Sequence, residues 1–425
     1  MASKPSTLVD LIQAIPADRT AVILPEPRVR VTYGALGGSV ERLARALAAA
    51  GVRRGDRVAI ALPNGLPLVV AVLAAALTGT AVPLNAESEE EAFRFRLEGV
   101  KARVLISDGA SAVRRAAADR VRFLAIDLEH LLTADPVRSA STHRSIPPSA
   151  DDVAMIVYTS GRTGPSKCVP LSHANLSISA QNIASSYVLD PEDVSFCVMP
   201  LHDLHGLVAS TLAAFASGGA VVVPGRFNPL SFWRIARDHG VTWYSAAPSI
   251  HQMLLARTAD PGVRMPAGAE RLRFIRSCGA ALPQQVGQTL ESSFGAPVLE
   301  AYAATEAAHQ IASNPPPPAE RKAGSVGRAT GMLIRIMDPG GGHVSAGESG
   351  EIVISGPNLT KGYEGNPDAT AAAFADGWFR TGDCGCLDAD GYLKLTGALE
   401  AQEVTCERDS SSAPFSLSAS AARRT

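Results

Sequence analysis

A segment rich in glycine and hydroxyl side chains has the residue types and spacing to bind phosphate. It follows the apolar run 154–157 and reads Tyr158-Thr159-Ser160-Gly161-Arg162-Thr163-Gly164-Pro165-Ser166-Lys167. Glycines let backbone N–H groups approach a ligand closely, hydroxyls add donors, and the lysine adds a positive charge. The GxxxxGK[ST] spacing of the P-loop is absent, so the segment predicts a nucleotide triphosphate bound by another fold, with a helix from Ser172. A flexible surface loop has the same composition and stays an alternative.

Polar side chains also follow other predicted strands. Tyr302, Thr305 and Glu306 come just after one strand, where a ring could stack on a base, a hydroxyl meet a phosphate and a carboxylate hold Mg²⁺. Asp383 follows an apolar run that we expect to end in a turn, and it could accept hydrogen bonds from both ribose hydroxyls. An ordinary strand end and a turn-capping aspartate are the structural alternatives. His205 leaves a further apolar strand, where a histidine is more often structural than catalytic.

The composition is that of a globular α/β enzyme. Of the 425 residues, 46% are hydrophobic and 19% are charged, and this length predicts at least two domains. The net charge of −2 argues against a nucleic-acid surface. Uninterrupted apolar runs stay below the roughly 18 residues of a membrane span, and the first residues lack a hydrophobic signal core. The last residues are not a peroxisomal signal either, so we expect a cytoplasmic protein that does not enter membranes.

Short apolar runs alternate with helix-compatible stretches, which predicts parallel sheets covered by helices. The strands expected first are 57–62, 81–84 and 103–106, and the helices after them are 68–77, 89–97 and 110–118. The strands expected further on are 194–199, 220–223, 241–245, 272–277 and 298–302, with helices at 231–239 and 283–294. Shorter strands that predict a small antiparallel or barrel-like unit are 333–337, 351–355, 378–381 and 392–395.

These patterns divide the chain into five parts. We expect a first α/β lobe at 8–128, a linker rich in proline and serine at 129–150, and a second α/β lobe at 151–320. The barrel-like subdomain would then occupy 321–397, followed by a divergent and disordered tail at 398–425.

Taken in this order, the segments resemble the superfamily of acyl-CoA synthetases, adenylation domains and luciferases. The matching segments are 158–168, Pro200-Leu201 with His205-Gly206, Tyr302 with Thr305-Glu306, Thr381-Gly382-Asp383, Val31-Thr32-Tyr33 and 79–84. Within the superfamily the chain is most similar to oxalate–CoA ligases, through segments that include 273–278, 294–302 and 313–315. The resemblance implies a large N-terminal α/β domain of two helix-covered, mainly parallel β-sheets plus a small distorted β-barrel subdomain, without the C-terminal α+β lid domain.

The resemblance also implies an activity: ATP and Mg²⁺ would activate a small acid such as oxalate to an acyl-adenylate, which CoA would then attack. The implied pyrophosphate cradle is Thr159, Ser160, Gly161, Thr163, Gly164 and Lys167. The other implied nucleotide-site residues are Gly279, Ala280, Tyr302 on adenine, Thr305 on the α-phosphate, Glu306 through Mg²⁺ and Asp383 on the ribose. Among these, Lys167, Thr305 and Glu306 would take part in the reaction. His205 and His309 match positions beside the substrate carboxylates, where a small diacid needs buried donors.

The sequence departs from the family pattern at several positions. Arg162 and Cys168 replace threonine and glycine in the phosphate segment, and Gly279 stands where oxalate-activating relatives carry serine. After Gly397 the family continues into a C-terminal domain with a catalytic lysine, whereas Ala398 begins an unrelated sequence. We therefore expect a truncated domain with impaired turnover and impaired use of CoA. A non-catalytic nucleotide-binding remnant and a ligase for a fatty or aromatic acid are the alternatives, and the oligomeric state is not predicted.

Overall fold

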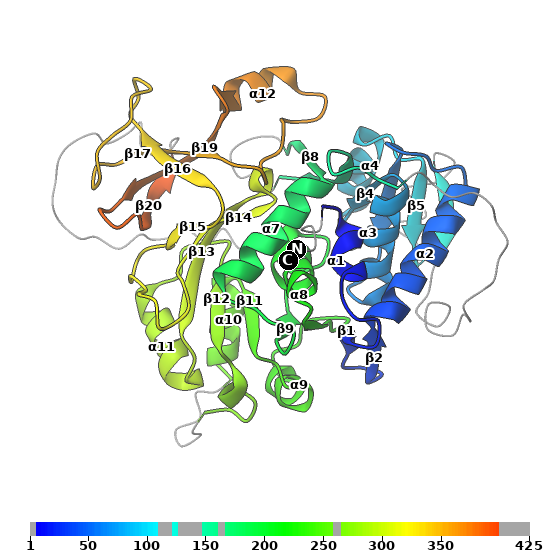
Figure 1. The fold of residues 1–425 in the computed structure, drawn as a ribbon, viewed down its shortest axis with the longest axis horizontal. Helices are drawn as coiled ribbons and strands as arrows, with labels where there is room; N and C mark the ends of the chain where they lie inside the picture. Colours follow the sequence, from blue (N-terminus) through cyan, green and yellow to red (C-terminus); the bar gives the residue numbers. More distant parts are fainter. Residues whose placement is uncertain (1–5, 109–120, 126–146, 160–165, 258–264, 399–425) are drawn as a thin grey trace, which may run out of the picture.

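The computed structural model describes residues 6–108, 121–125, 147–159, 166–257 and 265–398. Within these ranges the chain forms three sheets, of six, nine and five strands (Figure 1). The first two sheets are rich in parallel pairs and are covered by helices, and the third is antiparallel. The predicted fold class is therefore confirmed.

The six-stranded sheet is parallel except at its last pair. Its strands, in spatial order, are β6 (Arg122–Ala125), β5 (Val104–Ser107), β3 (Arg57–Ala61), β4 (Thr80–Pro83), β7 (Val153–Tyr158) and β8 (Cys168–Ser172). The helices near it are α1 (Leu8–Gln13), α2 (Tyr33–Ala49), α3 (Leu66–Thr78) and α4 (Glu90–Gly99). Helix α3 packs against α2 on one side and β3 and β4 on the other. This position buries almost every side chain of α3 and explains its wholly apolar sequence.

The nine-stranded sheet is parallel in its centre and antiparallel at both edges. Its strands, in spatial order, are β15 (Arg328–Ala329), β14 (His309–Ser313), β13 (Val298–Ala304), β12 (Phe274–Ser277), β11 (Trp243–Ala246), β9 (Val194–Cys197), β10 (Ala220–Val222), β1 (Thr20–Leu24) and β2 (Val29–Thr32). The helical segments around it are α7 (His173–Ser186), η1 (His205–Leu212), α8 (Ala213–Ser217), α9 (Phe232–His239), α10 (Pro248–Leu255), η2 (Ala269–Arg271), α11 (Gln284–Phe294) and η3 (Thr305–Ala307).

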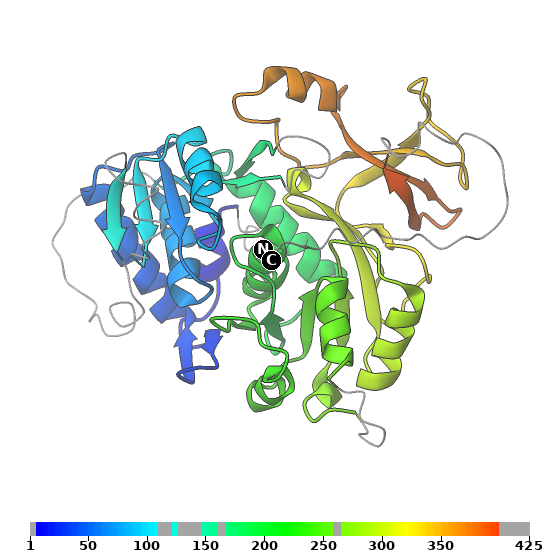
Figure 2. The ribbon, with the colours of Figure 1, turned by 180° about the vertical axis from the view of Figure 1, so that it is seen from behind.

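Successive side chains of the central strands enter two different cores. Trp243 and Phe274 join the large core that contains residues of α7 and α8. Tyr244 and Ile275, one residue further along each strand, join a second core formed with α9, α10 and α11. Each strand therefore packs on both faces, which is the pattern of a parallel sheet between two helix layers. Seen from behind, α10 and α11 cover one side of this sheet (Figure 2).

The two large sheets exchange segments of chain. Strands β1 and β2, from the expected first lobe, pair at the edge of the nine-stranded sheet, whereas β7 and β8 join the six-stranded sheet. Helix α7 begins directly after β8 and lies across the middle of the molecule (Figure 1). A capping box starts it, because Ser172 Oγ accepts from Asn175 N at 3.1 Å and Asn175 Oδ1 accepts from Ser172 N at 2.9 Å. The predicted helix start at Ser172 is confirmed.

The third sheet lies near the start of α7 (Figure 1). Its members are β16 (Leu333–Met337), β17 (Gly350–Ser355), β18 (Phe374–Ala375), β19 (Trp378–Leu387) and β20 (Leu393–Ala398), with helix α12 (Pro367–Ala373) nearby. Asn175 of α7 donates to the carbonyl oxygens of Pro357 and Leu359, each at 2.9 Å. These bonds attach the segment after β17 to the central helix.

Strand β8, which was not predicted, lies between the phosphate segment and helix α7 and pairs back onto β7 as an antiparallel strand. One local prediction was wrong. Asp383 does not follow a turn, because it lies inside β19, which continues for four more residues. Gly382 has φ +73°, and the pairing register of β19 shifts on either side of this region. The turn-like sequence therefore makes an irregularity within a strand and not its end.

Several expectations lie wholly or largely outside the described residues. They are the helix at 110–118, most of the linker at 129–150 and nearly all of the tail at 398–425. Within the described ranges, the helices are too short or too polar to cross a bilayer.

Gly206, the second residue of η1, allows the chain to turn tightly beside His205. A Cβ at this position would lie 2.3 Å from Pro200 O and 2.6 Å from Met199 O, which are backbone atoms that cannot rotate away. We expect Gly206→Ala to lower the free energy of unfolding by about 1–3 kcal/mol, because the backbone must shift to relieve the overlap. Chemical denaturation measures this change.

Gly225→Ala is the matched control, because a Cβ there has only Asn64 O nearby, at 3.9 Å. Equal stability of the two alanine variants would contradict the steric argument.

Candidate active site

The ends of the phosphate segment form a closed hairpin. Thr159 N donates to Lys167 O at 3.0 Å, and Lys167 N donates to Thr159 Oγ1 at 2.9 Å. The hydroxyl of Ser166 donates to Thr159 O at 2.6 Å. Thr159 and Lys167 are thus fixed at the neck of the hairpin. The remaining predicted cradle residues lie outside the described residues, namely Ser160, Gly161, Thr163 and Gly164.

Tyr363 links the lysine of this hairpin to the predicted magnesium ligand. Lys167 Nζ lies 5.1 Å from the centroid of the Tyr363 ring, and the Tyr363 hydroxyl donates to Glu306 Oε1 at 2.7 Å. The backbone supports the same connection, because Thr360 N donates to Glu306 O at 2.8 Å. Tyr363 was not predicted as a site residue, because no motif marks it; it lies in a loop between β17 and α12. Tyr363 thereby contacts both residues, with Lys167 over its ring and Glu306 at its hydroxyl.

A single carboxylate at this place suits magnesium. Glu306 lies on η3, directly after β13, and its side chain is half-buried. Among the described residues, no three His, Cys, Asp or Glu side chains gather into a metal cluster. Mg²⁺ keeps several waters and binds through one or two carboxylates plus substrate phosphates, so it does not need such a cluster. Glu306 therefore fits a magnesium ion that arrives with a nucleotide.

The predicted nucleoside residues come from different sheets and meet. The Tyr302 hydroxyl, at the end of β13, donates to Asp383 Oδ2 of β19 at 2.5 Å. Burial, followed by the charge of Asp383, holds the pKa of Tyr302 well above its usual value, so the phenol stays a donor. Thr305 is the first residue of η3, three residues after Tyr302, and its side chain is half-buried. The structure therefore brings Asp383 to the hydroxyl end of the Tyr302 side chain.

The two predicted substrate histidines lie against each other. His205 begins η1, His309 begins β14, and their ring centroids are 5.2 Å apart. Ala308 and His309 have φ of +50° and +107°, a left-handed conformation that non-glycine residues adopt at a cost of about 1–3 kcal/mol each. The Ser179 hydroxyl donates to Ala308 O at 2.7 Å and holds this strained segment. Placing His309 beside His205 therefore lowers the stability of the fold.

Arg276 of β12 lies behind both histidines and is fully buried. Its guanidinium nitrogens contact His205 Nε2 at 3.4 Å and His309 Nε2 at 3.2 Å. It also donates to Ser245 Oγ at 2.9 Å, Tyr187 Oη at 2.9 Å and Gln310 Oε1 at 3.0 and 3.2 Å. Arg276 was not predicted as a site residue, because its position in a strand shows none of these partners.

Gly279 and Ala280 follow β12 and are exposed. Gly279 has φ +96°, and a Cβ built on it would have one heavy atom within reach, His205 Nδ1 at 4.0 Å. The space in front of His205 is therefore open on this side. Ala280 is the next residue in the chain.

Three of these groups follow central strands of the nine-stranded sheet. His205, Gly279 and Glu306 each come after the carboxyl end of a central parallel strand, namely β9, β12 and β13. Ligands of open α/β sheets bind at this edge. The cluster therefore has the position of an active site.

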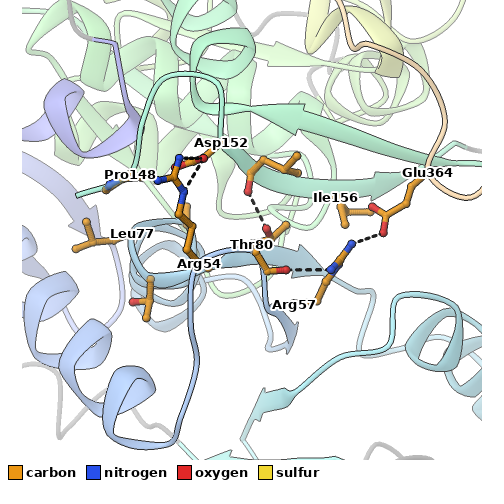
Figure 3. A pocket seen from close by; sticks show the side chains of 13 residues that line it. Arg54, Arg57, Leu77, Thr80, Pro148, Asp152, Ile156 and Glu364 are labelled. Atoms are coloured by element: carbon orange, nitrogen blue, oxygen red, sulfur yellow. Dashed lines mark hydrogen bonds and ion pairs between the residues drawn. The ribbon is translucent and has the colours of Figure 1, made fainter. Parts of the chain in front are cut away.

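A separate cavity of about 310 Å³ lies near the amino end of β7 (Figure 3). Residues near the starts of β3, β4 and β7 line it, at the amino ends of those strands. Its charged groups are already paired: Arg57 meets Glu364 at 2.5 Å, and Arg54 meets Asp152. Because these charges are paired with each other, the cavity has fewer polar groups available to bind a substrate than the histidine cluster has.

The fold, and polar groups near the carboxyl ends of its parallel strands, are typical of an α/β enzyme. Comparison with known proteins gives the family. The model of the family described as AMP-binding enzyme matches residues 12–364, and the chain belongs to this family.

Several relatives are CoA ligases. Oxalate–CoA ligase of Arabidopsis thaliana is 40% identical over 388 residues, which cover 88% of this chain and 75% of that protein. Sulfoacetate–CoA ligase of Cupriavidus necator is 36% identical over 392 residues, covering 89% and 75%. The solved N-terminal domain of FACL13 from Mycobacterium tuberculosis, bound to an inhibitor, matches with a TM-score of 0.81 and 28% identity, over 92% of this chain and all of that domain.

The buried histidines predict a specific pH dependence of stability. Burial lowers the pKa of His251, beside the site on α10, to about 4. In the unfolded chain histidine takes up its proton near pH 6.5, so the stability contributed by neutral His251 is complete above that pH and is lost as the pH falls toward 4. We expect His251→Gln to reduce the loss of unfolding free energy between pH 7 and pH 4 by about 3 kcal/mol.

Denaturant titrations at several pH values measure this difference between the variant and the unsubstituted chain. The comparison cancels the opposite contribution of Glu300, whose pKa burial raises to about 7. The exposed His343 gives the control variant, His343→Gln. Identical pH profiles for His251→Gln and the unsubstituted chain would contradict the expected burial of a neutral His251.

Proposed function

We propose that this protein activates a short carboxylic acid with a second anionic group, such as oxalate or sulfoacetate, at the expense of ATP. A carboxylate oxygen attacks the α-phosphorus, the bond to the β-phosphate oxygen breaks, and pyrophosphate leaves. The thiolate of CoA then attacks the carbonyl carbon of the acyl-adenylate, and AMP leaves. The names of the two relatives support both the reaction and the class of acid.

The observation that carries the proposal is the polar character of the substrate end of the site. Two buried histidines and a fully buried arginine meet there, and Gly279 leaves open space in front of His205. Burial, followed by the charge of Arg276, holds the pKa of each histidine well below its usual value, so both rings are neutral hydrogen-bond donors at physiological pH. A buried carboxylate needs such donors, whereas an apolar fatty tail would leave them unpaired.

The remaining residues suit the nucleotide. Lys167 at the hairpin neck would balance negative charge on the phosphates, and Glu306 would hold Mg²⁺, which neutralises charge on the transferring group. Tyr302 and Asp383 would take the nucleoside, with Thr159 and Thr305 beside the phosphates. CoA use belongs to the same proposal.

Calorimetric titration with ATP·Mg²⁺, with and without oxalate, tests this proposal. We expect ATP to bind and oxalate to strengthen its binding, whereas octanoate should have no such effect. Lys167→Met should weaken ATP binding roughly tenfold to hundredfold, since it removes a charged hydrogen bond. Lys361→Met is the matched control, because the Lys361 side chain is 85% exposed.

Absence of ATP binding would overturn the nucleotide part of the proposal. Binding that octanoate strengthens and oxalate does not would overturn the choice of acid and favour a fatty acid.

A further inference from the structure

The charge of Arg276 is not neutralised within the described part of the chain. Its side chain is fully buried, and no described Asp or Glu forms an ion pair with it. Its hydrogen-bond partners are neutral: two hydroxyls, an amide oxygen and two histidine rings. A guanidinium stays charged even when buried, and a buried charge without a counter-ion is unfavourable. The pocket beside it therefore favours an anion.

The hydrogen bonds around His205 determine which of its ring nitrogens carries the proton. The hydroxyl of Ser245, itself fully buried, accepts from Arg276 at 2.9 Å and lies 2.7 Å from His205 Nε2. Nε2 of His205 is the one acceptor that the described residues offer to the hydroxyl hydrogen. If Nε2 carried a proton, that hydrogen would be left buried without a partner, and the N–H would face the guanidinium. His205 therefore carries its proton on Nδ1.

The same reasoning applies to His309. Its Nε2 lies 3.2 Å from a terminal nitrogen of Arg276, which has hydrogens to donate and no lone pair to accept with. Nε2 of His309 must therefore be the acceptor, and its proton also lies on Nδ1. Neither Nδ1 forms a hydrogen bond with another described residue, although the two side chains are only 5% and 6% exposed.

We propose that Arg276 is a positioning residue that fixes both histidines as Nδ1–H donors, and that these two donors bind the second anionic group of the acid. This inference rests on the proposed function and assigns its acid specificity to named atoms. The Nδ1 of His205 is the one heavy atom within 4.0 Å of a Cβ built at Gly279, and the ring centroids of His205 and His309 are 5.2 Å apart. In this proposal, a short acid in the space beside Gly279 meets both rings. The anion is held by two neutral donors, while the charge of Arg276 attracts it from behind.

The groups that face the two rings are consistent with this arrangement. His205 is surrounded by Arg276, Ser245, His251 and His309. The groups on Arg276 itself are Tyr187, Gln310 and Cys278. No carboxylate appears among these groups, so a bound acid would be the first negative charge to reach the cluster.

Long-range ¹⁵N–¹H correlation spectra of the histidine rings in the full chain test the proposal. The signals are assigned by their loss in His205→Asn and His309→Asn. In the ligand-free protein we expect both rings as neutral Nδ1–H tautomers, and addition of oxalate with ATP·Mg²⁺ should shift both Nδ1 signals. In Arg276→Met the rings should also populate the Nε2–H form, and oxalate binding should weaken roughly tenfold to hundredfold.

Arg276→Lys keeps a charge and should retain more of the Nδ1–H form than Arg276→Met, even if the methionine variant is unstable. The exposed Arg226 supplies the control Arg226→Met, with unchanged tautomers and unchanged oxalate binding. An Nε2–H tautomer of either ring in the unsubstituted chain would overturn the inference, as would oxalate binding that is unaffected in Arg276→Met. If oxalate fails to bind the unsubstituted chain, the proposed function fails, and the ligand-free spectra still decide whether Arg276 fixes the tautomers.

Discussion

A single buried guanidinium, that of Arg276, connects the elements that form the substrate end of the site. Its partners come from four other places in the chain: Tyr187 after α7, His205 at the start of η1, Ser245 in β11, and His309 with Gln310 in β14. Removing one such partner leaves a buried donor unsatisfied, at a cost of about 1–3 kcal/mol. The arginine therefore fixes these elements relative to one another, and the same hydrogen bonds orient the two histidines.

Helix α7 carries this arrangement to the rest of the molecule. Its start follows the phosphate hairpin, Asn175 holds the segment after β17, and Ser179 holds the strained turn before His309. Tyr187, just past its end, reaches Arg276. One helix thus contacts the hairpin, the third sheet and the histidine cluster, which fixes the nucleotide groups relative to the acid-binding groups.

Much of this fold follows from local sequence. Apolar runs predicted the central strands of both large sheets within one to three residues, because strands buried on both faces need nearly continuous apolar side chains. The capping box at Ser172 and Asn175 likewise marks the start of α7 in the sequence itself. His205 and His309 were each selected by the family resemblance, and the structure places their ring centroids 5.2 Å apart.

What the sequence could not show depends on contacts between distant residues. Strand β8 is short, with its side chains only alternately buried and Pro170 in its middle, so its pairing with β7 leaves a weak local pattern. Gly382 looks like a turn residue but makes an irregularity within β19. Arg276 is one of two arginines in the predicted strand 272–277, and only the assembled sheet shows that it is buried among neutral partners. The role of Tyr363 likewise becomes visible only in the folded structure, where its hydroxyl binds Glu306.

The most direct test of the account is a crystal structure of the chain grown with oxalate, Mg²⁺ and a non-hydrolysable ATP analogue. We predict one oxalate carboxylate within hydrogen-bond distance of Nδ1 of both His205 and His309, with its other carboxylate toward the nucleotide and Arg276 unmoved behind the rings. Oxalate bound elsewhere, or histidine rings that turn Nε2 toward it, would contradict the account.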